Sequence, residues 1–297
     1  MKDYLVKALA FNDEIRAFAV HTTHLVDEAR QRHGCWPTAA AALGRTLTVA
    51  AMMGSQVKGD ETITIRVNGN GPIGTIVVDA NANGLVRGYV TNPKVHFQYQ
   101  TGKLNVGMAV GTDGQLSVTK DLGLKDYFTG QVPLQTGEIG DDFTYYFTVS
   151  EQIPSAVGVG VLVNSDNSVQ AAGGFIIQVM PGATEESLIK LEEALANIKP
   201  VSKMIDEGLT PEMVLETIFG ENQCRFLEKH EVRFECNCSK EKFESGIISL
   251  GGKEIQKMID EDNGAEAVCH FCMERYNFSE SELKKLKTQN FGIIDGN

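Results

Sequence analysis

Two closely spaced pairs of cysteines near the C-terminus constrain this chain more than any other feature. Cys236 and Cys238 are spaced CxC, Cys269 and Cys272 are spaced CxxC, and 30 residues lie between the pairs. Each pair places two sulfurs on one short turn, so the local backbone preforms half of a tetrahedral metal site. The sequence therefore predicts one zinc ion held by four thiolates, within a small module that folds between and around the two pairs.

Other interpretations of these cysteines have to be weighed. Four buried thiols without a metal are one alternative, because cysteine is often buried in protein cores. Two tight pairs within one short window favour a metal site instead. His270 lies inside the second pair and could in principle be a ligand, but four sulfurs already complete the shell.

The CxC spacing adds a chemical property. A disulfide across one intervening residue closes a tight ring, and strained disulfides tend to be labile or regulatory. From the residues alone the module is therefore either a purely structural zinc site or an oxidation-sensitive switch.

Length and composition indicate a globular protein. At 297 residues, of which 42% are hydrophobic, the chain can bury a sizeable core and can hold two domains. It has no apolar run near the length of a membrane span, and its first residues lack the apolar region of a signal peptide. The lone Cys35 and Cys224 do not suggest a secreted disulfide framework. We therefore expect a cytoplasmic protein that does not contact membranes.

The charge balance argues against nucleic acid as a partner. The formal net charge is -12, and residues 235–297 contain 12 acidic and 8 basic residues, a balance of -4. A module that reads phosphates needs a basic face.

The first 180 or so residues mix strand and helix patterns, which predicts an α+β fold. We expect an N-terminal mixed domain, residues 1–182, built on antiparallel sheet, with Pro181-Gly182 at its end. Its predicted helices begin at Thr22 or Thr23, with Gly34 at the end of this first helix, and at Pro37. The predicted strands are a hairpin of 4–10 and 15–20, a meander of 62–67, 75–79 and 85–90, strand-like pieces between 95 and 149 that include 143–149, and a hairpin of 157–163 and 171–179.

Motifs for enzymatic chemistry are weak. Residues 69–74 match GxGxxG, but a β-branched strand follows the glycines where a dinucleotide site needs a helix. The glycines before Lys253 are out of register with a phosphate-binding loop, and Glu254 stands where Ser or Thr would bind magnesium. His33 and Cys35 are two residues apart and seldom face each other at that spacing. We predict that the protein is not an enzyme.

Residues 183–234 differ in character from the domain before them. Thr184 and Thr210 can cap helices whose apolar residues recur at helical spacing, and Pro200 ends the first helix. The range contains 11 acidic and 6 basic residues. Short charged helices have little stability of their own and must pack on something else. We interpret this range as a helical linker, which is either an ordinary subdomain or a detachable cover over an apolar surface.

The chain resembles the thirty-three-kilodalton heat-shock chaperonin family, the redox-regulated holdase of bacteria. The likeness covers the whole chain and rests on the CxC and CxxC pairs, on residues 71–74 and on the region from Gly158 to Gly174. By this resemblance Cys236, Cys238, Cys269 and Cys272 are zinc ligands in the reduced protein. The resemblance also implies that oxidation forms the disulfides Cys236–Cys238 and Cys269–Cys272.

The resemblance further implies a domain plan and a mechanism. It implies a substrate-binding core (1–182), a metastable helical linker (183–234) and a zinc-binding redox switch (235–297), with a homodimer as the active form. Oxidation would release Zn²⁺ and unfold the switch and the linker, so that unfolding client proteins bind without ATP and do not aggregate under oxidative stress. Two other classes remain as alternatives, a structural or nucleic-acid-binding zinc protein and a thiol oxidoreductase that uses Cys269 and Cys272.

Overall fold

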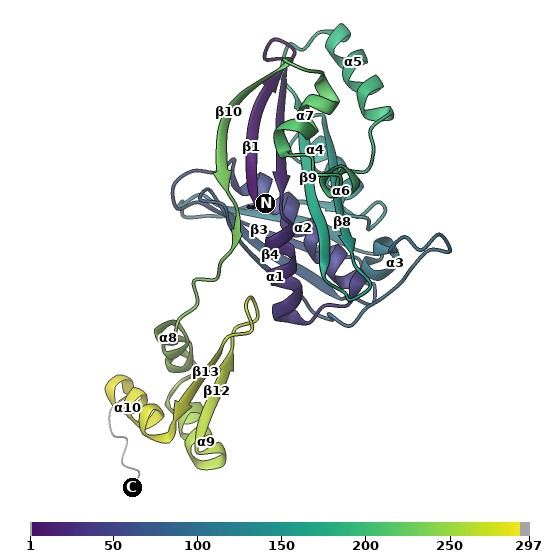
Figure 1. The fold of residues 1–297 in the computed structure, drawn as a ribbon. Coiled ribbons are helices and arrows are strands. Elements are labelled where there is room, and N and C mark those ends of the chain that lie inside the picture. The colour runs from purple at the N-terminus through teal and green to yellow at the C-terminus, as the bar shows by residue number, and fades with distance from the viewer. Residues whose placement is uncertain (1, 292–297) are drawn as a thin grey trace. The chain divides into compact units, whose positions relative to one another are not determined.

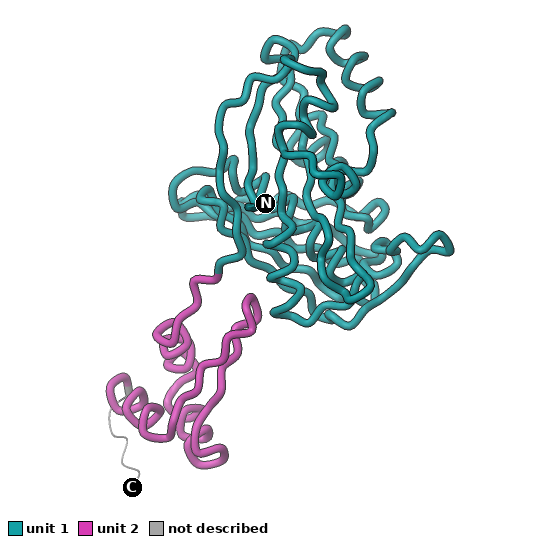
Figure 2. Tube along the Cα trace, viewed as in Figure 1, with its two compact units in different colours: residues 1–235 teal, residues 236–297 magenta. Residues whose placement is uncertain are grey.

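The computed structural model describes residues 2–291 and divides the chain into two compact units, residues 1–235 and 236–297 (Figure 2). Each unit has its own hydrophobic core. Among the described helices, none has both the length and the hydropathy that crossing a membrane requires.

Two mainly antiparallel sheets form the framework of the first unit (Figure 1). One sheet has five strands in the order β10-β1-β2-β9-β8 and the other has six in the order β11-β5-β4-β3-β6-β7. The N-terminal strands are β1 (Tyr4–Ala10), β2 (Ile15–His21), β3 (Thr62–Asn68), β4 (Thr75–Asn81), β5 (Leu85–Val90), β6 (Gln115–Asp121), β7 (Phe128–Pro133), β8 (Ser155–Val163) and β9 (Val169–Val179). The predicted hairpins and the meander are confirmed.

Helix α2 (Pro37–Gly54) lies in the main core and packs on strands of both sheets. Pro37 occupies its first turn, where the missing N–H costs nothing. All its residues from Thr38 to Gly54 are buried, and most of them are small. A Cβ added at Gly44 would stand 2.5 Å from Val26 and 2.9 Å from Val161, so a small residue is required there. Helix α1 (Thr23–His33) precedes it and ends at Gly34 in the left-handed conformation, as predicted.

The prediction of a strand at 143–149 is wrong, because these residues belong to helix α4 (Gly140–Val149). The aromatic residues favour strands by propensity. However, Phe143, Tyr146 and Phe147 recur at helical spacing and are all buried. The carboxylate of Asp142 also accepts backbone N–H bonds at the start of the helix, including one of 2.9 Å from Ile139. A short helix, α3 (Val106–Val110), likewise stands among the strand-like pieces predicted between 95 and 149.

The segment 183–234 contains the helices that the sequence predicts. It also contains two strands that the sequence did not predict. The helices are α5 (Glu185–Ala196), α6 (Val201–Asp206) and α7 (Pro211–Phe219), and the strands are β10 (Cys224–Glu231) and β11 (Arg233–Phe234). The side chains of Thr184 and Thr210 accept the predicted capping bonds. The segment is therefore helical only up to Phe219, and β10 then pairs with β1 as the outer strand of the sheet.

Helices α6 and α7 pack on the five-stranded sheet and α5 packs against α7, within a second hydrophobic cluster. Leu191, Val214, Leu215 and Ile218 are buried there, as their spacing predicts. Leu188 and Leu195 are only half-buried. The helices therefore cover apolar residues of β1, β2 and β9 that would otherwise face water.

The second unit is small. It consists of α8 (Lys240–Leu250), α9 (Gly252–Asp262), the hairpin of β12 (Gly264–Val268) and β13 (Arg275–Ser279), and α10 (Glu280–Phe291). Six buried residues form its hydrophobic cluster: Ile247, Ile255, Ile259, Phe278, Leu283 and Leu286. Residues 292–297 of the predicted C-terminal domain lie outside the described residues.

Candidate metal centre

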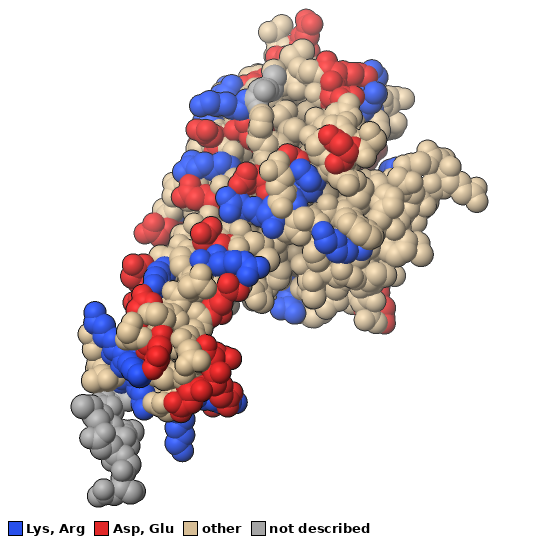
Figure 3. Space-filling model, turned by 60° about the horizontal axis from the view of Figure 1, so that its bottom comes forward, with Lys and Arg blue, Asp and Glu red and all other residues tan. Residues whose placement is uncertain are grey.

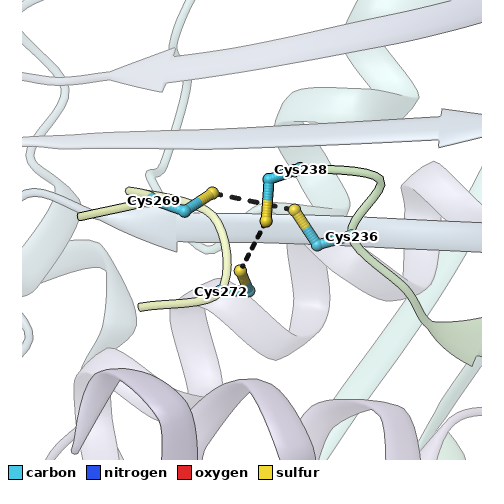
Figure 4. Close-up of side chains that lie close together, drawn as sticks. All are labelled: Cys236, Cys238, Cys269 and Cys272. Atoms are coloured by element: carbon cyan, nitrogen blue, oxygen red, sulfur yellow. Dashed lines mark hydrogen bonds between the residues drawn. The ribbon is translucent and has the colours of Figure 1, made fainter. Parts of the chain in front are cut away.

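The structure brings together the four cysteines that the sequence singled out. The Sγ atoms of Cys236, Cys238, Cys269 and Cys272 all lie within 4.8 Å of one another. Figure 4 shows the sulfurs pointing toward a common centre, two from the segment before α8 and two from the tip of the β12–β13 hairpin. Among the described residues, this is the group of side chains that could hold a metal ion.

The local backbone explains how each pair is positioned. At the hairpin, the backbone N–H of Cys269 donates to the carbonyl of Glu274 at 2.9 Å, and that of Met273 donates to the carbonyl of Cys269 at 2.7 Å. These bonds fold the CxxC segment into a turn, in which Met273 has a positive φ of 63°. The CxC segment is followed at once by α8, whose N-cap is Ser239. Both pairs are thus fixed by elements of the second unit.

The geometry fits a tetrahedral thiolate site. With metal–sulfur bonds of about 2.3 Å, the sulfurs of a zinc site lie roughly 3.8 Å apart. Here Cys236 and Cys269 have their sulfurs 3.7 Å apart, and Cys238 and Cys272 have theirs 3.4 Å apart. Both of these short distances join one sulfur of each pair, so a shared ion would link the segment before α8 to the hairpin.

The electrostatics of the cluster point to a cation. Burial is the main cause that raises the pKa of both Cys269 and Cys272. Hydrogen bonds among the neighbouring thiols raise the pKa of Cys272 further. Four sulfurs this close repel one another if all are ionised, so a bound divalent cation is the natural counter-charge that would hold them as thiolates.

Tyr276 is a component of the site that the sequence did not predict. Its hydroxyl lies 3.2 Å from the sulfur of Cys238, and its ring packs on Phe243 with centroids 5.0 Å apart. A hydroxyl at this distance donates a hydrogen bond to a thiolate and orients it, as the partners of metal ligands commonly do. The only sequence signal is its position four residues after Cys272, which becomes meaningful once the β12–β13 hairpin is known.

The remaining candidate residues lie outside the cluster. His270 is exposed and is not a member of the four-sulfur group. Cys35 is buried in the main core and Cys224 begins β10. Burial raises the pKa of Cys35 to about 12 and that of Cys224 to about 11, so both are protonated and poorly reactive at neutral pH.

Comparisons with known proteins agree on one family. The family model described as Hsp33 protein matches residues 3–279. The chain belongs to the Hsp33 family. Related proteins named 33 kDa chaperonin are 61% identical in Staphylococcus carnosus, over 96% of this chain and 97% of the relative, and 58% identical in Bacillus subtilis, over 97% and 99%.

A solved Hsp33 structure supports the same assignment. The 33 kDa chaperonin of Thermotoga maritima superposes with a TM-score of 0.91 at 39% identity, covering 97% of this chain and 99% of that one. The Hsp33 family is a family of chaperones, and the α+β fold predicted from the sequence is confirmed.

Proposed function

We propose that this Hsp33 protein is a redox-regulated holdase, a chaperone that binds unfolding proteins without ATP and is switched on by oxidation. The observation that carries the proposal is the four-sulfur cluster, whose separations suit one zinc ion and whose members can also form disulfides. In the reduced protein, Cys236, Cys238, Cys269 and Cys272 hold Zn²⁺, and client binding is off.

Oxidation converts the ligands into a form that cannot hold the metal. Each pair of thiolates loses two electrons to an oxidant such as hydrogen peroxide, which takes up two protons from solvent and is reduced to two water molecules. The products are the disulfides Cys236–Cys238 and Cys269–Cys272, so no thiolate remains to bind Zn²⁺. A disulfide sulfur is a poor ligand compared with a thiolate.

The second unit is suited to unfold when its metal is lost. Its hydrophobic cluster contains six buried residues, and domains this small commonly depend on a metal or disulfides for stability. The two ligand pairs lie at opposite ends of a 30-residue segment, so the ion closes a loop that the hydrophobic cluster alone holds weakly. Removal of the ion therefore favours the unfolded state of residues 236–297.

The linker, residues 183–234, is the second part of the switch. Its strand β11 ends at Phe234, two residues before Cys236, so unfolding of the second unit removes the fixed end of this strand. Helices α5, α6 and α7 cover an apolar face of the sheet, and their release exposes apolar surface on both sides. That surface is where we place the binding of unfolded clients.

The partners follow from this mechanism. We propose that clients are unfolding proteins of the bacterial cytoplasm and that the oxidised form assembles as a homodimer through newly exposed apolar surface. Figure 3 shows acidic and basic side chains interspersed over the face drawn, without a continuous basic surface of the kind that nucleic acids need. We accordingly propose no nucleic-acid partner and no membrane partner.

The test compares reduced, zinc-loaded protein with peroxide-treated protein in an assay of client aggregation under mild heat. We expect suppression only after oxidation, together with release of one zinc ion per chain and a rise in apparent mass on gel filtration. Peptide mapping of the oxidised protein should show disulfides within each pair. Disulfides between Cys236 and Cys269, whose sulfurs are already close, would contradict the proposed pairing. Equal suppression by both forms would refute the switch.

A matched comparison separates the metal from the fold. Cys236→Ser should abolish stoichiometric zinc in protein purified under reducing conditions, whereas His270→Ala should retain it because His270 lies outside the cluster. Retention of zinc by Cys236→Ser would show that these sulfurs are not its ligands. Disulfide-reductase activity of the purified protein would favour a thiol oxidoreductase instead.

A further inference from the structure

Strand β8 forms one edge of the five-stranded sheet, where β9 is its neighbour on the inner side (Figure 1). An edge strand presents backbone N–H and C=O groups that no neighbouring strand pairs. Proteins commonly protect such edges with charges, prolines or a covering element. Residues 157–163 of β8 read Val-Gly-Val-Gly-Val-Leu-Val, which contains neither charge nor proline.

The hydrogen bonds show which residues of β8 direct their backbone outward. The N–H of Val157 donates to the hydroxyl of Thr144 at 3.1 Å, on the side away from β9. Because orientation alternates along a strand, Val159 and Val161 face outward as well. The hydrogen bonds of β9 lead to the same orientation. Ala172 of β9 lies opposite Val161, and its carbonyl accepts from the N–H of Thr22 at 2.9 Å, on the side of β9 that faces away from β8. Within residues 2–291, no hydrogen bond occupies the outward N–H and C=O groups of Val159 and Val161.

A groove of about 920 Å³ follows this free edge. All seven residues from Val157 to Val163 line it. Its lining also includes residues 102–104, Glu138, residues 140–141 and the segment from Ile198 to Lys203, which enters α6. The groove therefore follows most of β8, where the free backbone groups lie.

Most of the charged side chains that line the groove are paired, and the two others, Lys103 and Asp141, have opposite charges. Arg45 pairs with Glu138 at 2.5 Å. Lys199 and Lys203 pair with carboxylates of the linker, Glu207 at 3.0 Å and Asp206 at 3.5 Å. A groove with neutralised charges, apolar side chains and free main-chain donors and acceptors suits a polypeptide backbone rather than an anion or a charged cofactor.

We propose that the free edge of β8 binds an extended segment of an unfolded client as an added β-strand. The outward groups of Val159 and Val161 recur every second residue, about 6.6–6.8 Å apart, which is the repeat of the groups that an extended chain presents on one side. Main-chain pairing recognises any unfolded sequence that can extend, because side chains contribute only the packing. This inference rests on the proposed holdase function and names its recognition mode.

The linker restricts the same groove. A Cβ built on Gly160 would stand 2.7 Å from Oγ of Ser202 and 2.8 Å from its Cβ, so α6 lies directly against β8. If the linker is released on oxidation, α6 leaves and the edge opens along the face that carries Gly158 and Gly160. Client pairing with β8 is therefore stronger in the oxidised protein than in the reduced one.

A pair of substitutions tests the outward N–H of Val159. Val159→Pro replaces the side chain with a ring and removes the N–H, whereas Val159→Ala removes most of the side chain and keeps the N–H. Proline is compatible with an edge position whose N–H points away from the sheet. In the full-length, peroxide-treated protein we expect Val159→Pro to bind an unfolded client about three- to tenfold more weakly than Val159→Ala, the effect of one lost hydrogen bond. Equal affinity of the two variants would overturn the proposal.

Peptide probes make the test independent of any folding defect in the variants. A fluorescent seven-residue peptide of alternating valine and threonine is prepared in three forms, with backbone N-methyl groups on the valines, on the threonines or on every residue. An extended peptide can turn over and present either edge, so strand addition requires that full methylation abolishes binding to the oxidised wild-type protein and that at least one half-methylated form retains it. Equal binding of the fully methylated and unmethylated peptides, or loss of binding by both half-methylated forms, refutes pairing with an edge.

The same samples distinguish three outcomes. If oxidised wild-type protein does not suppress client aggregation, the proposed holdase function itself fails. If suppression is intact but neither the variants nor the peptides discriminate, only the β8 proposal fails. A third outcome is that the unmethylated peptide does not bind the oxidised protein and that Val159→Pro is monomeric on gel filtration where the wild-type protein is a dimer. The edge of β8 would then pair with a second copy of the chain and not with a client, which also overturns the proposal.

Discussion

Replacement of Leu215 tests whether docking of the linker controls chaperone activity. Leu215 lies on α7 and is 0% exposed, in the cluster that joins this helix to the sheet. Val214, Ile218 and Phe219 share the cluster, so the cavity left by Leu215→Ala is surrounded by packed side chains that cannot easily fill it. A substitution of this kind costs about 2–5 kcal/mol.

If release of the linker is a local transition, this free energy destabilises the docked linker relative to the released linker. Because about 1.4 kcal/mol corresponds to a factor of ten, the released population should rise by roughly 30- to 4000-fold. The mutant should then suppress client aggregation under reducing conditions, where the proposed switch keeps the wild-type protein inactive, and should retain the zinc that we propose the cluster holds. Hydrogen exchange of residues 185–219 should accelerate, and exchange in the six-stranded sheet should not.

The control lies on the same helix. Met213 is 46% exposed, so Met213→Ala should change neither hydrogen exchange nor reduced-state activity. The reasoning is refuted if Leu215→Ala matches Met213→Ala in both assays. It is also refuted if exchange accelerates equally in both sheets, because the linker would then be an ordinary part of one cooperative domain.

Three further predictions follow from groups near and far from the metal centre. Replacing both Cys35 and Cys224 by serine should leave activation by peroxide unchanged, because burial raises the pKa of Cys35 to about 12 and that of Cys224 to about 11. Loss of activation would mean that the switch uses these thiols. Tyr276→Phe removes the hydroxyl 3.2 Å from the sulfur of Cys238 and should speed release of the proposed zinc ion in a colorimetric chelator assay by about three- to tenfold, with an unchanged rate counting against its role. Glu228 on β10 has a pKa lowered to about 2, chiefly by its hydrogen bond and ion pair with a lysine of β1. Its contribution to stability is therefore complete above about pH 4.5 and is lost as the pH falls toward about 2. In urea titrations, Glu228→Gln should therefore lose less stability than the wild-type protein between pH 5 and pH 3. An identical loss in the two proteins would exclude this ion pair as a cause.

Local patterns were sufficient for much of this structure. The positions of Pro37 and Gly34 predict a helix start and a helix end because each residue has a conformational preference of its own. The sequence pattern also predicts the meander of β3, β4 and β5, because side-chain direction alternates along any strand. Burial alternates along all three strands in the structure. The four cysteines could be grouped because ligand spacing within each pair is a property of a few consecutive residues.

Where neighbours far along the chain decide the outcome, the sequence failed or was silent. Residues 143–149 have aromatic strand propensity, but burial of Phe143, Tyr146 and Phe147 on one side of a helix overrides it. Strand β10 was missed because most of its side chains are exposed, so it has no apolar alternation, and its pairing with β1 joins residues more than 200 positions apart.

The site shows the same division. The sequence by itself grouped Cys236, Cys238, Cys269 and Cys272 into two close pairs, because each pair needs only its own turn. Tertiary structure decided that the half-sites meet, that Tyr276 reaches the sulfur of Cys238, and that β8 has a free edge. Each of these depends on which strands and loops become neighbours, and that is fixed by the packing of the whole unit rather than by any local run of residues.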